Sequence, residues 1–442
     1  MSEKQYLSNF SYIFIPFYFE KEEHFYSFND NLKKSYTWAP IDDEIRYLHR
    51  YVSDRLVNTN NGKTNLNHYR LCNNNEVCST DRFYKTSPKT FKGQENVTFD
   101  FQISDVQLFS FNTTICIMAF QLQFQNDDPL QIAAAQYYLR KISTERIYTI
   151  TDSGKENSFS FIDLSKKLLG NLVEKYELDF FFYATPQNER ANFFTYIDMP
   201  SKKDYSEELF FLKWCYHDGF VFEDDSEEDD SIDYVASKNT VWGISPSAAV
   251  CLVSRCDQNK NFIENVFQKN IQKQYLFTYI LLLHQKYMMY LFLTKISVGI
   301  DNDLDLLENY KRRLYEFETK YMFSKVSEVP QYQRFYDKVA HCFFLKEMFQ
   351  DVQEPLSRLT ELQRQVSEER QRKYDNGINA ALMTLSMLTI VSAVTDASGI
   401  TNNLEWLFSP QISKIIQISM VTLVLLVSVL MIIRLFFLKN KR

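Results

Sequence analysis

The chain contains little glycine and proline, with 9 and 10 residues of these types among 442. This scarcity excludes collagen-like repeats and long low-complexity linkers. Aromatic residues are plentiful instead, and the 38 Phe and 28 Tyr argue for a folded protein. Basic residues are fewer than acidic ones: the chain has 49 Lys and Arg and 56 Asp and Glu, which gives a net charge of -7. Direct binding of DNA or RNA is therefore not expected, whereas a local pocket for one anionic ligand stays open.

Seven cysteines are present without any C-x-x-C pair, and this pattern predicts reduced thiols that face a cytosol. The close pairs Cys72/Cys78 and Cys251/Cys256 lack further His or Cys ligands at zinc-site spacing. The six histidines form no metalloprotease motif, and no nucleophile elbow or Gly-rich dinucleotide turn occurs. We therefore expect no catalytic residue, no bound metal, no required cofactor and no enzymatic activity.

An acidic segment, residues 223–233, has two interpretations. Its carboxylates could hold a regulatory divalent cation such as Mg²⁺. The segment lacks the spaced ligands and the turn glycine of a calcium loop, so a solvated loop is the preferred interpretation.

Two long uncharged runs lie near the C-terminus, at residues 376–395 and 415–433. Each is close to the roughly 20 residues that a helix needs to cross a hydrocarbon core of about 30 Å. The second run is the more apolar, and the first carries Asn, Ser and Thr. Together they predict a two-helix membrane hairpin joined by an outer loop at 396–414.

Basic residues flank the two runs on one side. Arg370, Arg372 and Lys373 precede the first run, and the tail 434–442 is basic, while the loop contains only Lys414. The positive-inside bias then keeps both termini in the cytoplasm and turns the loop outward. We expect a two-span protein of the cytoplasmic (inner) membrane that contacts lipid.

A third apolar region, residues 275–294, is interrupted at its centre by His284, Gln285 and Lys286. A charge at that position is costly in lipid. A long buried cytoplasmic helix is the preferred interpretation, and a membrane segment or a surface-lying helix is the alternative.

The first 258 residues mix strand and helix patterns, which predicts an α+β (or α/β) cytoplasmic sensor domain. The N-terminal run Phe10–Phe19 is expected to be a core strand rather than a signal peptide. The other expected strands are 97–103, 106–111, 114–124, 178–185 and 193–199. The expected helices are 41–57, 130–142, 161–176 and 206–216.

A long helical region at 259–350 follows, with helices expected at 261–297, 304–323 and 331–349. The stalk region 351–375 follows. Its helix is expected to start at Pro355, which suits a first turn, and to continue into the first run. Its apolar seam predicts packing against copies of the chain or against the preceding helices of the same subunit. The seam residues are Val352, Leu356, Leu359, Leu362 and Val366.

This order of elements resembles the CorA-like divalent-cation transporters. Asn376-Gly-Ile-Asn379, followed by the apolar residues 382–390, is similar to the start of that family's pore-lining first span. The resemblance covers residues 350–442 in local sequence and the earlier part in architecture. It implies a homo-oligomer, with five subunits in the family, and a metal-ion path along the first span.

The loop departs from the family pattern. CorA-like proteins carry Gly-Met-Asn after the first span, associated with hydrated Mg²⁺, whereas this chain has Gly399 and Asn402 one residue further apart. It is therefore similar to the type III CRISPR-associated branch, whose antiviral membrane effectors respond to a small nucleotide messenger, adenylated S-adenosylmethionine. The polar residues expected near the outer mouth are Asp396, Ser398, Gly399, Asn402 and Asn403.

Two faces of the first span could line the ion path. At 3.6 residues per turn, one stripe contains Asp375, Asn379, Met383, Ser386, Ile390 and Ala393. It would present a carboxylate, an amide ring, a methionine constriction and a hydroxyl ring to a cation, and it is preferred. The other face contains Ala381, Thr384, Leu388, Ser392 and Thr395, and could be the path or a close helix contact.

The sequence therefore predicts an oligomeric membrane cation channel or transporter, gated through its cytoplasmic domain and acting as an antiviral effector. A housekeeping Mg²⁺ transporter is one alternative, and a hairpin-anchored interaction protein without conduction is another. The transported ion, the subunit number and the ligand-binding residues are not determined by the sequence.

Overall fold

Strand β1, Asn9–Tyr18, lies in the middle of a sheet and is buried along its whole length in the computed structural model of the chain. It pairs antiparallel with β6, Ile115–Phe124, and with β9, Asn192–Met199. A strand covered on both faces can be apolar at every position rather than at alternate ones. The prediction that Phe10–Phe19 forms a core strand is therefore confirmed.

The structure describes residues 9–41, 46–56, 64–72, 76–79, 82–88, 98–150, 156–180, 182, 189–199, 204–217, 219–220, 231–254, 260–297, 304–403, 409, 411–412, 414–416, 418–419, 422–423 and 426. The remaining strands are β2 Trp38–Pro40, β3 Leu66–Leu71, β4 Tyr84–Thr86, β5 Phe99–Phe111, β7 Ile147–Ile150, β8 Glu156–Phe159, β10 Ile232–Ser237, β11 Thr240–Ile244 and β12 Ala248–Ser254. The helices up to the last strand are α1 His24–Lys34, α2 Arg50–Leu56, the short η1 Glu76–Cys78, α3 Pro129–Leu139, α4 Phe161–Leu169, α5 Leu172–Lys175 and α6 Ser206–Trp214. The later ones are α7 Lys260–Phe262, η2 Ile263–Phe267, α8 Gln268–Asn270, η3 Ile271–Tyr275, α9 Leu276–Ser297, α10 Leu304–Tyr321, α11 Pro330–Cys342 and α12 Leu345–Asn403.

The strands form one mixed sheet with the order β10-β11-β12-β9-β1-β6-β5-β4-β7-β8, and β2 and β3 join it through β5. Strands β12 and β9 run parallel, whereas the other pairs in the described part of the chain are antiparallel. This arrangement confirms a mixed sheet domain followed by long helices.

Some predicted strands are corrected. The expected strands 97–103 and 106–111 are one strand, β5, because a bulge between Ile103 and Asp105 shifts the register without ending the pairing. Of the expected strand 178–185, the described residues contribute only a bridge between Asp179 and Tyr18. Residues 181 and 183–185 of that strand, and 42–45 and 57 of the expected helix 41–57, lie outside the described part.

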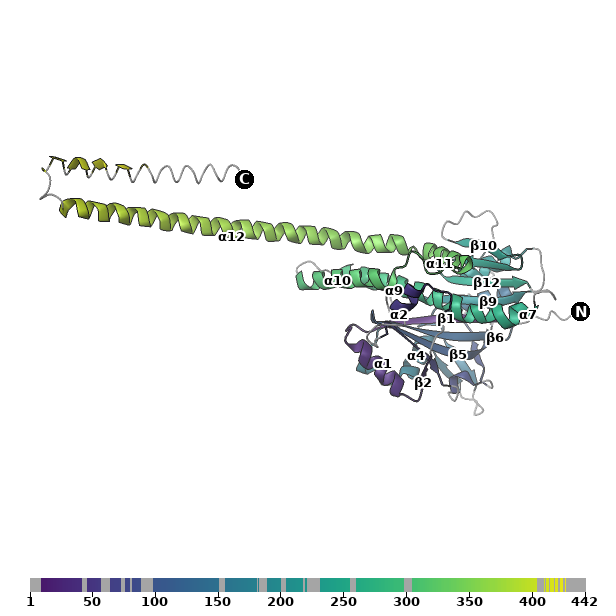
Figure 1. The fold of residues 1–442 in the computed structure, drawn as a ribbon. Helices are drawn as coiled ribbons and strands as arrows, with labels where there is room; N and C mark the ends of the chain where they lie inside the picture. Colours follow the sequence, from purple (N-terminus) through teal and green to yellow (C-terminus); the bar gives the residue numbers. More distant parts are fainter. Residues whose placement is uncertain are drawn as a thin grey trace, which may run out of the picture. The chain divides into compact units, whose positions relative to one another are not determined.

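Helices cover both faces of the sheet (Figure 1). Ile13 and Phe17 of β1 join a cluster with buried residues of α1, α3, α4 and α6. Phe14 packs instead against Tyr279 of α9, with ring centroids 5.5 Å apart. Trp242 of β11 contacts Phe335 of α11 at 4.6 Å. These contacts define three layers, with the sheet between two sets of helices.

Helix starts on the first face follow local sequence signals. The Asp128 side chain accepts a hydrogen bond from the Leu130 N–H, and Pro129 opens α3. Ser160 and Asp163 form a reciprocal capping box at the start of α4. The two ends are thus defined by residues that the sequence already displays.

Helix α9 contains the third apolar region. Residues 276–289 are all buried, and the helix packs on β6 and against α10 and α11. His284 contacts Phe111 with ring centroids 3.8 Å apart, and its Nε2 lies 2.6 Å from Thr113 Oγ1. The preferred interpretation of this region as a buried helix is therefore confirmed.

The last long helix begins earlier than the sequence suggests. We expected its first turn at Pro355, but α12 begins at Leu345 and contains Pro355 in its interior. Proline removes one backbone hydrogen bond there. Leu345, Val352 and Leu356 are buried on both sides of the proline and hold the helix in place. The break before α12 falls at Phe344, whose φ is 53°.

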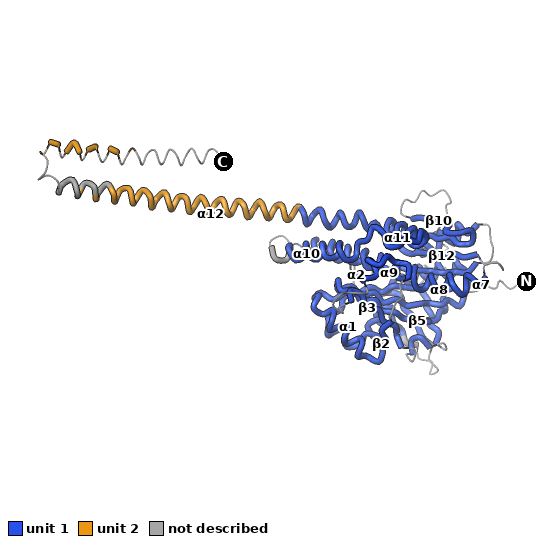
Figure 2. Tube along the Cα trace, viewed as in Figure 1, with its two compact units in different colours: residues 1–357 blue, residues 358–442 orange. Residues whose placement is uncertain are grey.

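The chain divides into two compact units, residues 1–357 and 358–442 (Figure 2). The first contains the sheet, its helices and the start of α12. The second begins with the remainder of α12, which rises roughly 70 Å at 1.5 Å per residue. The helical region 259–350 thus belongs to the same compact unit as the sheet.

One described helix, α12, is long and apolar enough to cross a membrane by length and composition, within Leu345–Ala393. Its apolar window has a mean hydropathy of 1.3, and none of the window is buried. The second run, 415–433, lies mostly outside the described residues, so the two-helix hairpin remains a prediction.

Candidate functional site

The polar stripe of the first span lies on helix α12. Asp375, Asn379 and Ser386 are exposed, as are Met383 and Ala393, and Ile390 is half-buried. At about 100° per residue, the stripe occupies an arc of about 80° around the helix. The structure therefore gives these side chains one helical face, and their role as pore-lining residues stays a prediction.

The alternative face lies on the opposite side of the same helix. Thr384 is two residues from Ser386 and thus about 160° away around the axis. The hydroxyl of Thr384 donates to the Ala380 carbonyl oxygen at 2.9 Å, a bond inside its own helix. Leu388, also on this face, is 62% exposed. The two faces lie on opposite sides of α12, so substitutions can test them separately.

Helix α12 contains the first residues of the segment 396–414 that we predicted as an outer loop. Helix α12 continues to Asn403, so the five residues from Asp396 to Asn403 that we placed in a turn belong to the helix. Gly399 does not end it, because a glycine inside a helix costs only about 1 kcal/mol relative to alanine. Residues 404–408, 410 and 413 of the expected loop lie outside the described part.

The stalk seam crosses the boundary between the two units. Val352 and Leu356 are buried in the first unit, and Leu359 is half-buried. Leu362 and Val366 belong to the second unit and are 56% and 50% exposed. The N-terminal part of the seam is therefore covered by the chain itself, whereas its C-terminal part is exposed and could contact a second copy.

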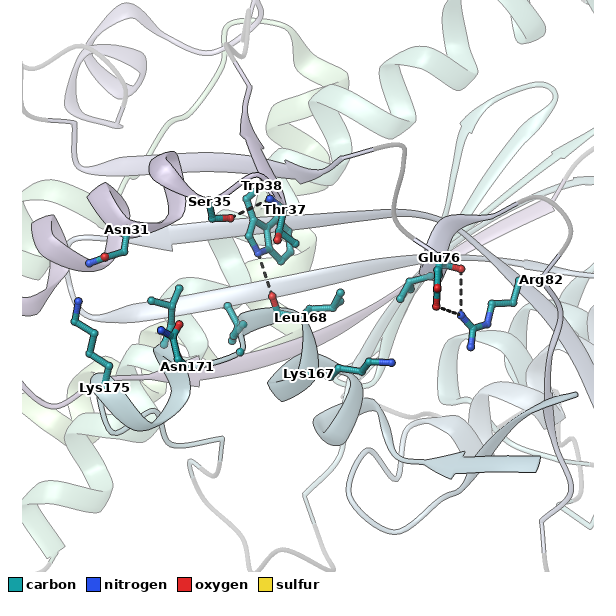
Figure 3. A pocket seen from close by; sticks show the side chains of 14 residues that line it. Asn31, Ser35, Thr37, Trp38, Glu76, Arg82, Lys167, Leu168, Asn171 and Lys175 are labelled. Carbon is teal, nitrogen blue, oxygen red and sulfur yellow. Dashed lines mark hydrogen bonds and ion pairs between the residues drawn. The ribbon is translucent and has the colours of Figure 1, made fainter. Parts of the chain in front are cut away.

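A pocket of about 580 Å³ opens on the sheet-bearing unit (Figure 3). Helix α1 and strand β2 contribute Asn31 and Trp38, η1 contributes Glu76, and the segments around α4 and α5 contribute Lys167 and Lys175. Its size lies within the roughly 300–1,000 Å³ that small-molecule sites occupy. The pocket is thus built from segments that are far apart in the sequence.

Backbone geometry fixes one wall of the pocket. Gly170 ends α4 with a φ of +57°, and its N–H donates to the Lys166 carbonyl oxygen at 2.9 Å. Glycine adopts this left-handed conformation without steric cost, so the chain can turn at once into α5. The Trp38 indole N–H donates to the Leu168 carbonyl oxygen at 3.4 Å and joins the opposite wall to α4.

The charge of the lining is positive. Arg82, Lys167 and Lys175 contribute three cations, and Glu76 is the carboxylate among the lining residues. The Arg82 Nη1 lies 3.5 Å from Glu76 Oε2. In Figure 3, Lys167 extends toward this ion pair, and Lys175 lies at the other end beside Asn31. The arrangement can bind an anion but offers no nucleophile next to a base.

A second polar site is buried beneath helix α9. The Lys286 ammonium donates to Asn192 Oδ1 and to the Pro246 carbonyl oxygen, at 3.2 Å each. It also lies 4.5 Å from the centroid of the Phe343 ring, in the segment between α11 and α12. Burial and the nearby Arg140 lower the pKa of Lys286 from 10.5 to about 7. A cation in this position is costly, and that cost depends on pH.

We expect Lys286→Met to remove a pH dependence of stability. Between pH 10.5 and 7 the unfolded chain binds a proton that the folded chain does not, so the free energy of unfolding falls as the pH falls. The loss should total a few kcal/mol in order of magnitude and should level off below pH 7. Denaturant unfolding of both chains at several pH values measures it. The exposed Lys311→Met is the control, and parallel pH profiles for wild type and Lys286→Met would contradict the assignment.

In the described part of the chain, no group of three or more His, Cys, Asp or Glu side chains is placed to hold a metal ion. Six cysteines within that part are free thiols, and Cys256 lies outside it. Of the acidic segment 223–233, Asp233 is in β10 and pairs with Lys213 at 3.0 Å, while 223–230 lie outside the described residues.

Sequence reasoning did not identify the pocket residues. Lys167 and Lys175 are ordinary basic residues at helix ends, and Arg82 stands in a segment without a motif. Their convergence depends on the packing of α1, α4 and α5 around the edge of the sheet. The basic last turns of α4 and α5 were a signal in the sequence, but helix ends carry such residues without any ligand.

A scan against protein-family models gives no match, and a search of curated proteins gives none either. Among solved structures, the CorA magnesium transporter from Methanocaldococcus jannaschii is similar to this chain at 13% identity and a TM-score of 0.17. The match covers 54% of this chain and 89% of that one. Values this low do not establish a shared fold. The relation to CorA-like proteins therefore rests on the order of the elements and on the residues around Asn379.

Proposed function

We propose that this chain is a homo-oligomeric membrane cation channel of the CorA-like kind, gated by a ligand of its sheet-bearing unit. One observation carries the proposal: helix α12 starts within that unit and continues as an exposed, apolar helix that has Asp375, Asn379 and Ser386 along one face. Polar groups are costly in hydrocarbon, so a helix that contacts only lipid is not expected to have Asp375, Asn379 and Ser386 on one face. Repeated around an axis, the same stripe provides a path for cations.

The helix also supplies a route for gating. Phe343, immediately before α12, is buried and packs against Tyr279 of α9 with ring centroids 5.7 Å apart. A movement of α9 relative to the sheet would therefore reach the base of α12. A ligand changes conduction only if it binds the closed and open states with different affinity.

The proposed topology has both termini in the cytoplasm, two spans including 415–433, and several identical subunits.

The finer proposal is an antiviral type III CRISPR effector that responds to adenylated S-adenosylmethionine. It is supported by the altered Gly399 and Asn402 spacing, which departs from the Mg²⁺-reading loop of CorA-like transporters. Growth arrest only when the messenger is produced would support this role. Restoration of Mg²⁺ uptake in transporter-deficient cells would instead favour a housekeeping transporter.

Conduction is tested with purified protein in liposomes. We expect cation flux that depends on a nucleotide ligand, together with an oligomer in detergent. The rival is an interaction protein that the helix merely anchors. Absence of flux with every cation and nucleotide extract, together with a monomer in detergent, would defeat the channel proposal.

A further inference from the structure

We propose that the pocket of Figure 3 binds a phosphorylated small molecule through Arg82, Lys167 and Lys175. Binding at this pocket does not depend on conduction, whereas a role of that binding in gating rests on the proposed function. The ligand is identified by chemistry alone: a phosphate or phosphate ester small enough for about 580 Å³.

The charge balance singles this pocket out. The chain as a whole carries a net charge of -7, yet three cations and one carboxylate line this opening. Like charges that gather at one place repel one another, so the arrangement gains free energy when an anion enters. The cations come from three separate segments, one before β4 and two at the ends of α4 and α5. No single helix end accounts for all of them.

The ion pair inside the pocket is easily exchanged. The Glu76 side chain is 87% exposed, and its oxygen lies 3.5 Å from the Arg82 nitrogen. An exposed pair of this kind contributes little to stability, because solvent screens the two charges. A phosphate offers two negative charges and several acceptor oxygens to the same guanidinium, which binds such groups in a bidentate manner. We therefore infer that the ligand phosphate displaces Glu76 from Arg82, beside Lys167.

At the end of the pocket away from Glu76, one cation lies among neutral polar groups. Lys175 lies there beside Asn31, whose amide donates to the Ser27 carbonyl oxygen and to the Tyr176 hydroxyl. Trp38 between the two ends is buried and its N–H is engaged, so its ring does not offer an open stacking face. Recognition should therefore depend more on phosphate than on a base.

Binding is measured by calorimetry on the full-length protein in detergent, with pyrophosphate, AMP, ribose 5-phosphate and adenosine as probes. We expect the three phosphate compounds to bind and adenosine to bind far more weakly. In Lys167→Ala/Lys175→Ala the affinity should fall by about tenfold or more, because two of the three cations that attract the phosphate are removed. Lys311→Ala removes an exposed lysine elsewhere and should change nothing.

Glu76→Gln provides a test in the opposite direction. Removing the competing carboxylate should tighten phosphate binding severalfold, whereas weaker binding would overturn the displacement step. The side chains of Glu76, Lys167 and Lys175 are exposed, so the variants should have the same melting temperature as the wild type. No phosphate binding at millimolar concentration, or equal affinity in wild type and the lysine double variant, would overturn the site.

The two proposals fail separately. If the double variant loses phosphate binding but liposome flux and its ligand response are unchanged, the pocket is a site without a gating role. If binding is as expected and the wild type conducts no cation, the channel proposal fails while the binding site stands.

Discussion

Ser386→Leu is expected to reduce cation flux by about tenfold or more, because a bulky apolar side chain would be repeated around the axis at the same depth. The matched change on the opposite face, Thr384→Leu, should leave flux within about twofold of wild type, since that side chain would contact lipid or a neighbouring helix. Both variants replace a small hydroxyl side chain with leucine, and they differ only in their position around α12. Flux in liposomes, normalised to oligomeric protein, measures the difference.

Asn379→Leu extends this test by about two turns along the same stripe. A loss of flux in Asn379→Leu and Ser386→Leu, but not in Thr384→Leu, would assign the ion path to the preferred face. The reverse pattern would assign it to the face of Thr384 and Leu388. Unchanged flux in all three variants, at normal oligomer yield, would mean that α12 does not line the path.

Trp242→Ala should destabilise the sheet-bearing unit by about 3–5 kcal/mol, a typical cost of truncating a buried tryptophan. The side chain is fully buried, and its ring lies 4.6 Å from Phe335 and 5.1 Å from Tyr275. These contacts join β11 to α11 and to the helical segment before α9. The truncation would leave a cavity at the place where the helical layer packs on the sheet.

Denaturant unfolding of the full-length protein, followed by circular dichroism, measures this loss. Trp214→Ala is the control, because Trp214 is half-buried and stacks on Tyr216 at the end of α6. Its loss should be clearly smaller. Equal unfolding midpoints for Trp242→Ala and wild type would contradict the central place of Trp242 in this layer. A lower ligand response of Trp242→Ala below its melting temperature would link the same contacts to gating.

Much of the fold was readable from local patterns. The apolar run Phe10–Phe19 predicted a core strand, and β1 is such a strand. Helices were expected to start near residues 130 and 161, and in the structure the side chains of Asp128 and Ser160 cap α3 and α4 there. Errors arose where distant packing overrode a local rule. Pro355 looked like a first-turn residue, yet burial of Leu345 and Val352 carries the helix through it.

The two candidate sites differ in the same respect. The stripe from Asp375 to Ala393 follows from helical periodicity, so a linear sequence is enough to draw it. The pocket needs Arg82 and Lys175 to come together from different segments around the sheet. The local sequence around Arg82 and Lys175 does not predict that the two side chains line the same pocket.

By itself, the sequence determined an apolar, uncharged segment long enough to cross a membrane, a polar stripe along it, and a preceding domain of mixed strands and helices. These features depend on composition and on periods of 2 and 3.6 residues, which are properties of neighbours in the chain. Only the tertiary structure decided that Lys286 is a buried cation against Phe343, and that three separate cations line one pocket. Burial and charge proximity are properties of neighbours in space, and 24% charged residues can be distributed over a fold in many ways.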